Sequence, residues 1–421
     1  MERYQKYLNL KAKFRYKYRG IEMDGVMSLK LWDYANFPKL KDFSWRSNIK
    51  VFMAYQMTDL VFDKEKNTIL TLFGAYNRKD HLALYNNVLN KLDGKASYNE
   101  VLKLGKKFVF HPTMLIELFK YIRSNLSDIL SFKTQWKLFV NTAFYCNTLH
   151  EIEKIELDGI KKFMCQCSVL DIEHMMTQYM KLHHIPTYSL EEGLYYIFKK
   201  NIPVDFIQYE NFITDHLLSW GQYSVDEDVS YGIPKDRLLV AGYPKNVSLS
   251  TLKENNKYKR CMILLARDAM RSSNMGLLDI LSYFTSEYHF CIKLHPNSDH
   301  SFYSQYAKKH FMDIVSEELT INDCLNKEAF DFAIAVNTTA YYEAYMRGLP
   351  CLRYLDEFFS LSKGCNDIFQ TKEEFSSLME RIKATSMQDY QSEIDYILSY
   401  VMGVGIDNYK KILCDDKESA F

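Results

Sequence analysis

The sequence of 421 residues lacks the features of several large protein classes. It contains no apolar run of about 18 residues, so no transmembrane helix is expected, and its first twenty residues lack the apolar core of a signal peptide. Its basic and acidic side chains balance at 53 each. Because binding to the phosphate backbone of a nucleic acid requires a strongly basic surface, nucleic acid is not an expected partner.

Short motifs of several enzyme and metal-binding classes are missing as well. The nine cysteines include no CxxC pair, so the sequence predicts neither a zinc site nor a disulfide framework, and it favours a reducing cytoplasm. Neither GxGxxG nor GxxxxGK[ST] occurs, which disfavours dinucleotide-binding and P-loop enzymes. The GxSxG motif of serine hydrolases is also absent.

What remains is the pattern of a globular α/β protein, with 47% hydrophobic and 25% charged residues. The length predicts two or three domains, and a polar stretch near residues 243–259 separates two blocks of alternating strands and helices. We therefore expect an N-terminal α/β domain over 1–245, a C-terminal α/β domain over 246–375 and a helical tail over 376–421. The tail could pack back on the body.

Four segments of the N-terminal block predict strands followed by helices. Residues 67–92 predict a buried strand to Phe73, a turn at Gly74 and an amphipathic helix. Residues 106–126 and 136–155 repeat the scheme less cleanly. Residues 160–193 predict a strand, a helix and a second strand that ends at the paired glutamates.

Polar residues follow a predicted apolar strand in the segment 291–299, CIKLHPNSD. Lys293 and His295 project to the same side if the strand alternates, and Pro296 prevents further ladder pairing. Ligands bind outside the carboxyl ends of parallel strands. The segment thus places a cation and an imidazole where a phosphate would bind, and an ordinary strand-end histidine is the alternative.

A second candidate anion site follows the strand that ends at Val336. Asn337, Thr338 and Thr339 open a predicted helix, whose free N–H groups and hydroxyls could bind an anion. Simple capping of the helix is the alternative. Glu343 lies one turn into the helix, where it could hold a ribose or lie on a solvated face.

The loop LLARDAMRSSN follows the first strand of the C-terminal block. Arg267, Ser272 and Ser273 in this loop could reach a donor molecule. A plain polar loop is the alternative.

Two adjacent carboxylates, Glu191 and Glu192, end the last strand of the segment 160–193, and Gly193 allows a tight turn. Adjacent carboxylates repel, so one could have a raised pKa and act as a general base. Two surface glutamates are the alternative.

Taken in chain order, these motifs resemble those of GT-B glycosyltransferases that use cytidine nucleotides, most closely bacterial sialyltransferases and capsule polysialyltransferases. The shared marks are an acidic pair with glycine, a His-Pro pair and a later Ser/Thr pair, here Glu191-Glu192-Gly193, His295-Pro296 and Thr338-Thr339. By motif order the resemblance covers roughly residues 160–355. It implies two Rossmann-like domains facing across a cleft, with a CMP-linked nucleotide-sugar donor in the second.

The resemblance also implies roles for individual residues. One glutamate of the pair deprotonates the acceptor hydroxyl, with Glu191 as the first choice. His295 binds the donor phosphate and supports the leaving group, Thr338 and Thr339 bind the same phosphate, and Lys293 adds positive charge. A single displacement inverts the anomeric centre, and neither a metal nor a further cofactor is required.

The donor sugar and the acceptor stay open. The segment 210–245 is also similar to teichoic-acid glycerophosphotransferases, in which a histidine stands where the paired glutamates stand here. A CDP-polyol phosphotransferase or a UDP-hexose transferase is therefore an alternative to a CMP-sialic acid enzyme of capsule or lipopolysaccharide biosynthesis. A non-catalytic scaffold in a capsule assembly complex is another. The acceptor is expected to be an oligosaccharide or a lipid-linked glycan.

The first twenty residues alternate basic and aromatic side chains. Such a stretch suits the surface of an anionic membrane, which would hold the protein at the inner face of the cell membrane. A solvated helix packed on the body is the alternative. The basic residues are Arg3, Lys6, Lys11, Lys13, Arg15, Lys17 and Arg19.

Overall fold

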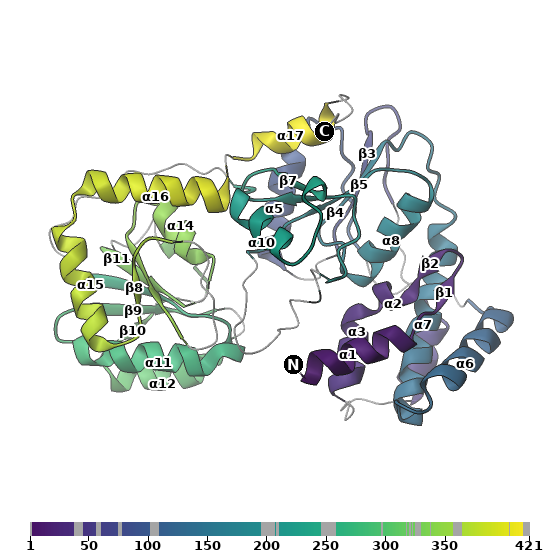
Figure 1. Ribbon diagram of the computed structural model, residues 1–421, viewed down its shortest axis with the longest axis horizontal. Helices are drawn as coiled ribbons and strands as arrows, with labels where there is room; N and C mark the ends of the chain where they lie inside the picture. Colours follow the sequence, from purple (N-terminus) through teal and green to yellow (C-terminus); the bar gives the residue numbers. More distant parts are fainter. Residues whose placement is uncertain are drawn as a thin grey trace.

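A computed structural model shows two α/β units linked by the C-terminal helices (Figure 1). The residues that it describes are 2–37, 45–55, 60–74, 78–101, 109–194, 207, 210–245, 258–295, 298–316, 318–319, 321, 323–324, 330–336, 338–356, 364–403 and 405–415. The predicted fold class, two Rossmann-like α/β domains, is confirmed by the two parallel sheets.

The first sheet has five parallel strands in the order of the chain. Outside β3, Ala96 and Glu100 form parallel bridges with Ile69 and Phe73. The chain therefore visits the far side of β3 before it crosses to β4, and the direction of winding reverses between these two strands. The strands are β3 (Ile69–Leu72), β4 (Lys162–Cys165), β5 (Thr187–Leu190), β6 (His216–Ser219) and β7 (Leu238–Val240).

Helices cover both faces of the first sheet, so every residue of β3 and β5 is buried. Apolar side chains of α5 (Lys79–Asn90) and α17 (Asp407–Cys414) pack with the sheet on one face. The other face packs against α7 (Phe132–Ile152) and α8 (Asp171–Leu182). The other elements of this part are α1 (Glu2–Lys13), β1 (Lys17–Tyr18), β2 (Ile21–Glu22), α2 (Met23–Val26), α3 (Ser28–Asn36), α4 (Trp45–Phe52), α6 (Pro112–Leu126), α10 (Gln222–Ser230) and η1 (Lys235–Arg237).

One predicted strand in the first domain is wrong. The segment 136–155 lies almost entirely within α7, a helix of 21 residues that begins after the N-cap Ser131. Because α7 is apolar on most sides and is buried, its apolar run resembles a strand. In the segment 106–126, the helix α6 begins at Pro112, whereas residues 102–108 lie outside the described residues.

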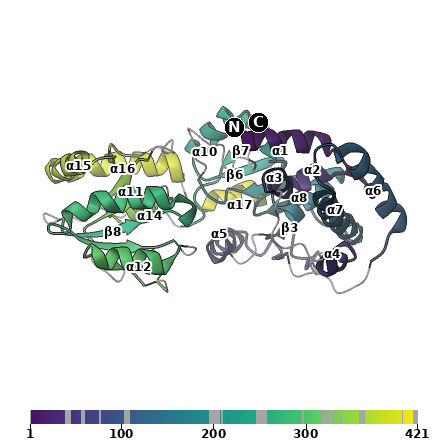
Figure 2. The ribbon, with the colours of Figure 1, turned by 90° about the horizontal axis from the view of Figure 1, so that it is seen from below.

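The second sheet has six parallel strands in the order β10-β9-β8-β11-β12-β13. This is the Rossmann order, in which the winding reverses between the first strand, β8, and the fourth, β11. Figure 2 shows α12 and the α15–α16 pair on opposite sides of this domain. The elements are β8 (Arg260–Leu264), η2 (Asp268–Met270), α11 (Arg271–Leu281), η3 (Ser282–Phe284), β9 (His289–Lys293), α12 (His300–Lys309), β10 (Asp313–Ile314), β11 (Phe332–Ala335), α14 (Ala340–Met346), β12 (Cys351–Tyr354), β13 (Ile368–Phe369) and α15 (Lys372–Ala384).

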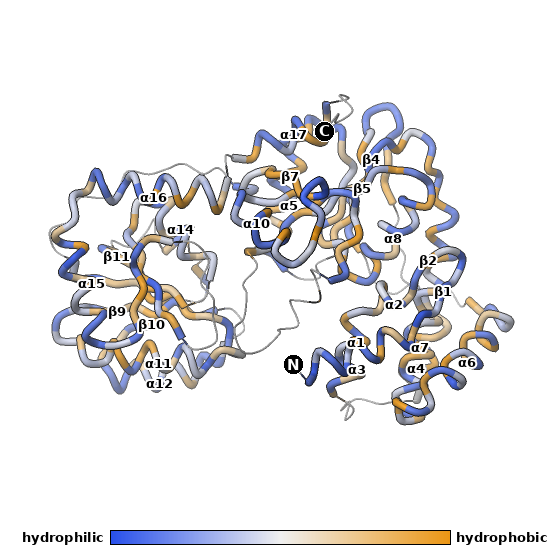
Figure 3. The backbone as a smooth tube through the Cα atoms, viewed as in Figure 1, coloured by the Kyte–Doolittle hydropathy of each residue, from blue (hydrophilic) through white to orange (hydrophobic). Residues whose placement is uncertain are grey.

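The core of the second domain is built from these strands. Figure 3 shows apolar residues concentrated along them, and β8, β11 and the helices packed on them form one cluster of buried side chains. At the start of α15, Thr371 and Glu374 form the capping box that their spacing indicates.

The C-terminal helices return from the second domain to the first. Helix α16 (Met387–Met402) contacts both α14 and α10, and α17 packs on the first sheet. The chain crosses where glycines allow close backbone contact: a Cβ atom on Gly403 would lie 2.1 Å from the carbonyl oxygen of Trp220, and one on Gly242 would lie 2.4 Å from that of Gly405. A hydrogen bond from Tyr243 N to Met402 O, 2.7 Å long, fixes the crossing.

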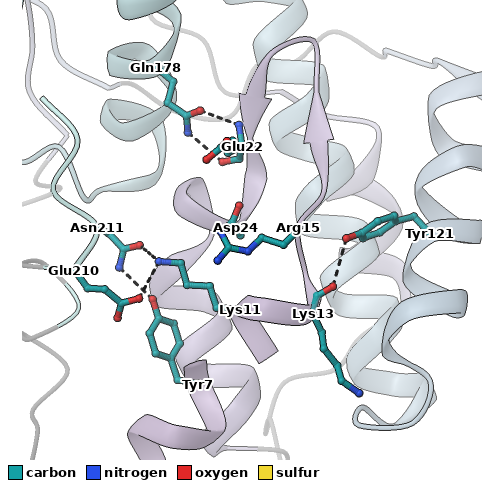
Figure 4. A network of polar contacts seen from close by, with 10 residues as sticks. All are labelled: Tyr7, Lys11, Lys13, Arg15, Glu22, Asp24, Tyr121, Gln178, Glu210 and Asn211. Carbon is teal, nitrogen blue, oxygen red and sulfur yellow. Dashed lines mark hydrogen bonds and ion pairs between the residues drawn. The ribbon is translucent and has the colours of Figure 1, made fainter. Parts of the chain in front are cut away.

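The basic and aromatic N-terminus packs on the first domain (Figure 4). Tyr7, Leu10 and Phe14 are buried, and Lys11 donates to Glu210 at 3.1 Å. These contacts fit the alternative of a helix packed on the body, because the rings of Tyr7 and Phe14 are buried in the core. Further ion pairs join Lys6 to Glu2, Lys13 to Asp128, Arg15 to Asp24 and Arg19 to Glu153. No helix within the described ranges is long and apolar enough to cross a membrane.

Candidate active site at the carboxyl ends of the two sheets

The first candidate region lies where the winding of the first sheet reverses, at the carboxyl ends of β3 and β4. Glu173 of α8 connects the two ends: Gln166 N, just after β4, donates to its Oε1 at 2.7 Å. A Cβ atom on Gly74, just after β3, would lie 2.8 Å from its Oε2. Glu173 is fully buried, and burial raises the pKa of its carboxyl well above the usual value. A glycine at position 74 is therefore what makes room for this carboxyl group.

Glu191, at the end of β5, is an interior side chain. It is 1% exposed, and its carboxylate accepts hydrogen bonds from Trp220 N at 2.6 Å and Ser224 Oγ at 2.7 Å. Burial raises the pKa of Glu191 to about 8, and the charge of Asp228 adds to the rise. Repulsion by the adjacent Glu192, the cause expected from the sequence, is not among the causes.

Glu192 has a different environment, although it is the next residue. Its side chain is 16% exposed, and its Oε2 lies 3.7 Å from Nδ1 of His81 on α5. Its charge contributes to the raised pKa values of Glu173 and Cys167, so it lies near the ends of β3 and β4. Of the two glutamates, Glu192 is the one that an acceptor could reach from solvent.

Sequence reasoning missed three residues of this region. His81 lies in the polar first turn of α5 and belongs to no motif, and Glu173 has the position of an ordinary acidic residue in the first turn of a helix. Gln166 is 1% exposed, and both polar atoms of its side chain lack a hydrogen-bond partner among the described residues. Only the fold brings these residues to one edge of the sheet.

The second candidate region includes the end of β9. Lys293 is 9% exposed, and its Nζ donates to the carbonyl oxygen of Ser316 at 2.9 Å. It therefore connects β9 to the segment after β10, with its charge below the surface. His295 follows as a half-buried side chain, and its carbonyl accepts a hydrogen bond from Ser298 N at 2.9 Å. Pro296 lies outside the described residues.

The predicted anion site after β11 is only partly described, because Asn337 lies outside the described residues. Thr338 Oγ1 accepts a hydrogen bond from Ala340 N at 3.3 Å. Thr339 occupies the N-cap position of α14, a helix of seven residues, and its side chain makes no capping bond. Local capping by Thr338 is thus observed, while both threonines stay half-exposed at the strand end.

The loop after β8 lies between the ends of β9 and β11, because these two strands flank β8 in the second sheet. Arg267 and Ser272 are exposed there, whereas Ser273 is buried and donates to Asp356. Asn274 fixes the end of β8 through two hydrogen bonds of 3.0 Å to the backbone of Ala266. Because β9, β8 and β11 are neighbours in the sheet, His295, Arg267 and Thr338 follow three adjacent strand ends at the point where the winding reverses.

Glu343 joins the two domains. Its Oε1 accepts hydrogen bonds from Tyr243 Oη and Lys245 Nζ, each 2.8 Å long, and both donors follow β7 of the first sheet. The solvated-face alternative for Glu343 is therefore wrong. Its predicted contact with a ribose stays a prediction.

Comparisons with known proteins identify no family for this chain. No protein-family model matches it, and no curated protein matches it. Among solved structures, it is similar to UDP-GlcNAc 2-epimerase from Methanocaldococcus jannaschii in complex with UDP-GlcNAc and UDP, at 13% identity and a TM-score of 0.47 over 82% of this chain and 98% of that chain. UDP-GlcNAc 2-epimerase from Neisseria meningitidis is similar at 12% identity and 0.44, over 82% and 98% of the two chains.

A third similar structure is the lipopolysaccharide outer core galactosyltransferase WaaB in its apo form. The identity is 12% and the TM-score 0.49, over 82% of this chain and 98% of that chain. Likenesses at this level fix neither the substrate nor the reaction of this chain.

Proposed function

We propose that this protein is an inverting, metal-independent glycosyltransferase of bacterial surface polysaccharide biosynthesis. The second domain binds a nucleotide-sugar donor, and the first domain supplies the base that activates an acceptor hydroxyl. The observation that carries the proposal is the placement of His295, Arg267 and Thr338 after three adjacent strands at the reversal of the second sheet. Ligands of doubly wound sheets bind at such points.

The base is Glu192. Its carboxylate is partly exposed and close to His81, whereas Glu191 has its oxygens occupied by Trp220 N and Ser224 Oγ in the interior. A general base must reach the proton that it removes, so accessibility decides between two neighbours of the same type. We therefore place the role that the sequence first suggested for Glu191 on Glu192.

The reaction follows from these positions. Glu192 accepts the proton of the acceptor hydroxyl, and the acceptor oxygen bonds to the anomeric carbon as the bond from that carbon to the donor phosphate breaks. The phosphate leaves with the bonding electrons, and its negative charge is stabilised by His295 and the hydroxyls of Thr338 and Thr339. Lys293 and Arg267 add a positive field, and Ser272 offers a further hydroxyl. One displacement inverts the configuration.

The donor is best described by its nucleotide. A CMP-linked acidic sugar such as sialic acid is the first choice because of the order of the acidic, His-Pro and Thr-Thr motifs. A CDP-polyol phosphate or a UDP-hexose is the alternative. The acceptor is an oligosaccharide or a lipid-linked glycan.

Thermal unfolding with CMP, CDP and UDP, each in large excess, tests this proposal. A ligand that binds only the folded state raises the melting temperature, and we expect the largest rise with CMP. A larger rise with CDP or UDP would keep the donor site and change the donor. No rise with any of the three would contradict a nucleotide-binding enzyme.

A further inference from the structure

At the amino end of β9, away from the carboxyl ends of both sheets, three side chains of metal-binding type meet. His289 and Cys291 are two residues apart on β9, so they face the same side of the sheet. Asp313 of β10 is the direct partner of Cys291 in the parallel register. One ligand atom from each residue lies within 4.8 Å of the others.

The three side chains run from the interior to the surface. Cys291 is 2% exposed, whereas the side chains of His289 and Asp313 are 51% and 68% exposed and are joined by a 2.7 Å contact between Nε2 and Oδ2. A pocket of about 270 Å³ opens beside His289. Two of the three ligands are therefore open to solvent, and the buried thiol lies within 4.8 Å of their ligand atoms.

We propose that His289, Cys291 and Asp313 bind a divalent transition-metal ion of the Zn²⁺ type. Imidazole nitrogen, thiolate sulfur and carboxylate oxygen are the donors that Zn²⁺ takes, and they suit it better than Mg²⁺ or Ca²⁺. Three protein ligands leave a fourth position for water. On binding, the Cys291 thiol loses its proton to solvent and the sulfur bonds to the metal.

The geometry is within reach of a tetrahedral site. Bonds of about 2.0–2.3 Å place neighbouring ligand atoms about 3.4 Å apart. The 2.7 Å contact between His289 and Asp313 must therefore lengthen slightly, which small rotations of these exposed side chains allow. Lys259, a cation that lines the same pocket, is held by a hydrogen bond from its Nζ to the carbonyl oxygen of Glu287.

The proposed ion would lie away from the donor site. Its ligands join the two-residue edge strand β10 to β9, and Lys293 with the predicted donor site lies at the opposite end of the same strand. The ion would protect an exposed sheet edge and leave the sugar chemistry untouched. The inference therefore does not depend on the proposed function.

Co²⁺ is the probe for the first experiment, since a cobalt–thiolate bond absorbs in the near ultraviolet. The full chain is freed of metal with a chelator and titrated with Co²⁺, and Zn²⁺ is then added to displace it. We expect a charge-transfer band that saturates at one ion per chain and disappears with Zn²⁺. His289→Gln and Asp313→Asn should weaken Co²⁺ binding at least about tenfold, and Cys291→Ser should abolish the band.

Matched controls separate the site from other residues of the same type. His183→Gln and Cys414→Ser change an exposed histidine and a partly exposed cysteine in the first domain, and both should keep the band. Because Cys291 is buried, Cys291→Ser could misfold, and the two exposed positions keep the test decisive. No band in the natural chain, or an equal band in His289→Gln and Asp313→Asn, would overturn the proposal and leave a simple His–Asp hydrogen bond.

Discussion

The two sheets have similar topology, but the side chains near their carboxyl ends differ in charge and chemical type. The first sheet ends in acidic groups, Glu173, Glu191 and Glu192, two of which are buried. The second ends in a cation, an imidazole and hydroxyl groups. Both sheets are doubly wound, so the topology fixes where a ligand binds and the side chains at the strand ends fix what happens there. The proposed division between a base and a phosphate site rests on this difference.

A second contrast lies between two neighbours in the first sheet. Glu191 and Glu192 are the same residue type, yet one is an internal hydrogen-bond acceptor and the other is partly exposed beside His81. Both residues follow the end of β5 at Leu190, and their side chains have different surroundings.

The largest effect is expected for Glu192→Gln. Loss of a general base should lower sugar transfer by about 10²–10⁴-fold, while the free energy of unfolding changes by less than about 0.5 kcal/mol. Transfer is measured with the donor that the nucleotide screen selects.

The control for that variant is Glu191→Gln. Its amide oxygen can accept from Trp220 N and its amide nitrogen can donate to Ser224 Oγ, so the free energy of unfolding in urea should change by less than about 1 kcal/mol and most of the transfer activity should remain. Full loss of transfer at unchanged stability would instead make Glu191 the base.

The next effect concerns the crossing between the domains. Gly403 has φ +68°, and an added Cβ would meet the Trp220 carbonyl oxygen at 2.1 Å, so Gly403→Ala should cost at least about 3 kcal/mol. Gly232→Ala is the matched control, since Gly232 has φ +92° and no atom within 4 Å of the added carbon. It should cost only about 1–2 kcal/mol. Equal urea midpoints for the two variants would show that the close contact is not limiting.

A smaller effect is a dependence of stability on pH. Burial raises the pKa of Asp228 from 3.8 to about 8, and both of its carboxylate oxygens lack a hydrogen-bond partner among the described residues. The folded state therefore holds a proton that the unfolded state releases above about pH 4. The contribution of Asp228 to stability is then complete below about pH 4 and decreases as the pH rises towards 8, by up to about 1.4 kcal/mol per pH unit.

Asp228→Asn removes this titration and should flatten the slope. Urea unfolding of both proteins at pH 6, 7, 8 and 9 measures it, and the other buried carboxyls with raised pKa values, Glu173 and Glu191 among them, contribute to the slope that remains. Parallel slopes in the two proteins would contradict a buried, protonated Asp228.

The smallest effect is expected at the contact between the domains. Lys245→Met removes the ion pair with Glu343, whose side chains are 33% and 15% exposed, and should cost about 0.5–1 kcal/mol. Tyr243→Phe removes the second donor to the same oxygen. A double-mutant cycle in urea should give a coupling between the two positions, and additivity would mean that they act independently.

The elements with continuous apolar runs could be predicted from the sequence. The strands β4, β5, β9 and β11 lie where the pattern places them. The helix α7 could not be separated from a strand, because its buried faces give it the same apolar run. The apolar pattern of a segment therefore predicts that the segment is buried more reliably than it predicts whether the segment is a strand or a helix.

The candidate site could be predicted only in part. The acidic pair and the Lys-x-His-Pro segment are local in the chain, so they could be found. The separate roles of Glu191 and Glu192 depend on Trp220, Ser224 and His81, which are distant in sequence. Glu173 could not be predicted either, since its partners are brought together by the reversal of the sheet between β3 and β4.

The central claim is that the second domain binds the donor and the first supplies the base, and calorimetry on two variants tests it most directly. The nucleotide that stabilises the natural chain most is titrated into His295→Ala and Glu192→Gln. The account predicts that His295→Ala weakens binding at least about tenfold, or about 1.4 kcal/mol, and that Glu192→Gln binds as the natural chain does. Equal loss in both variants, or unchanged binding in His295→Ala, would contradict this division of roles.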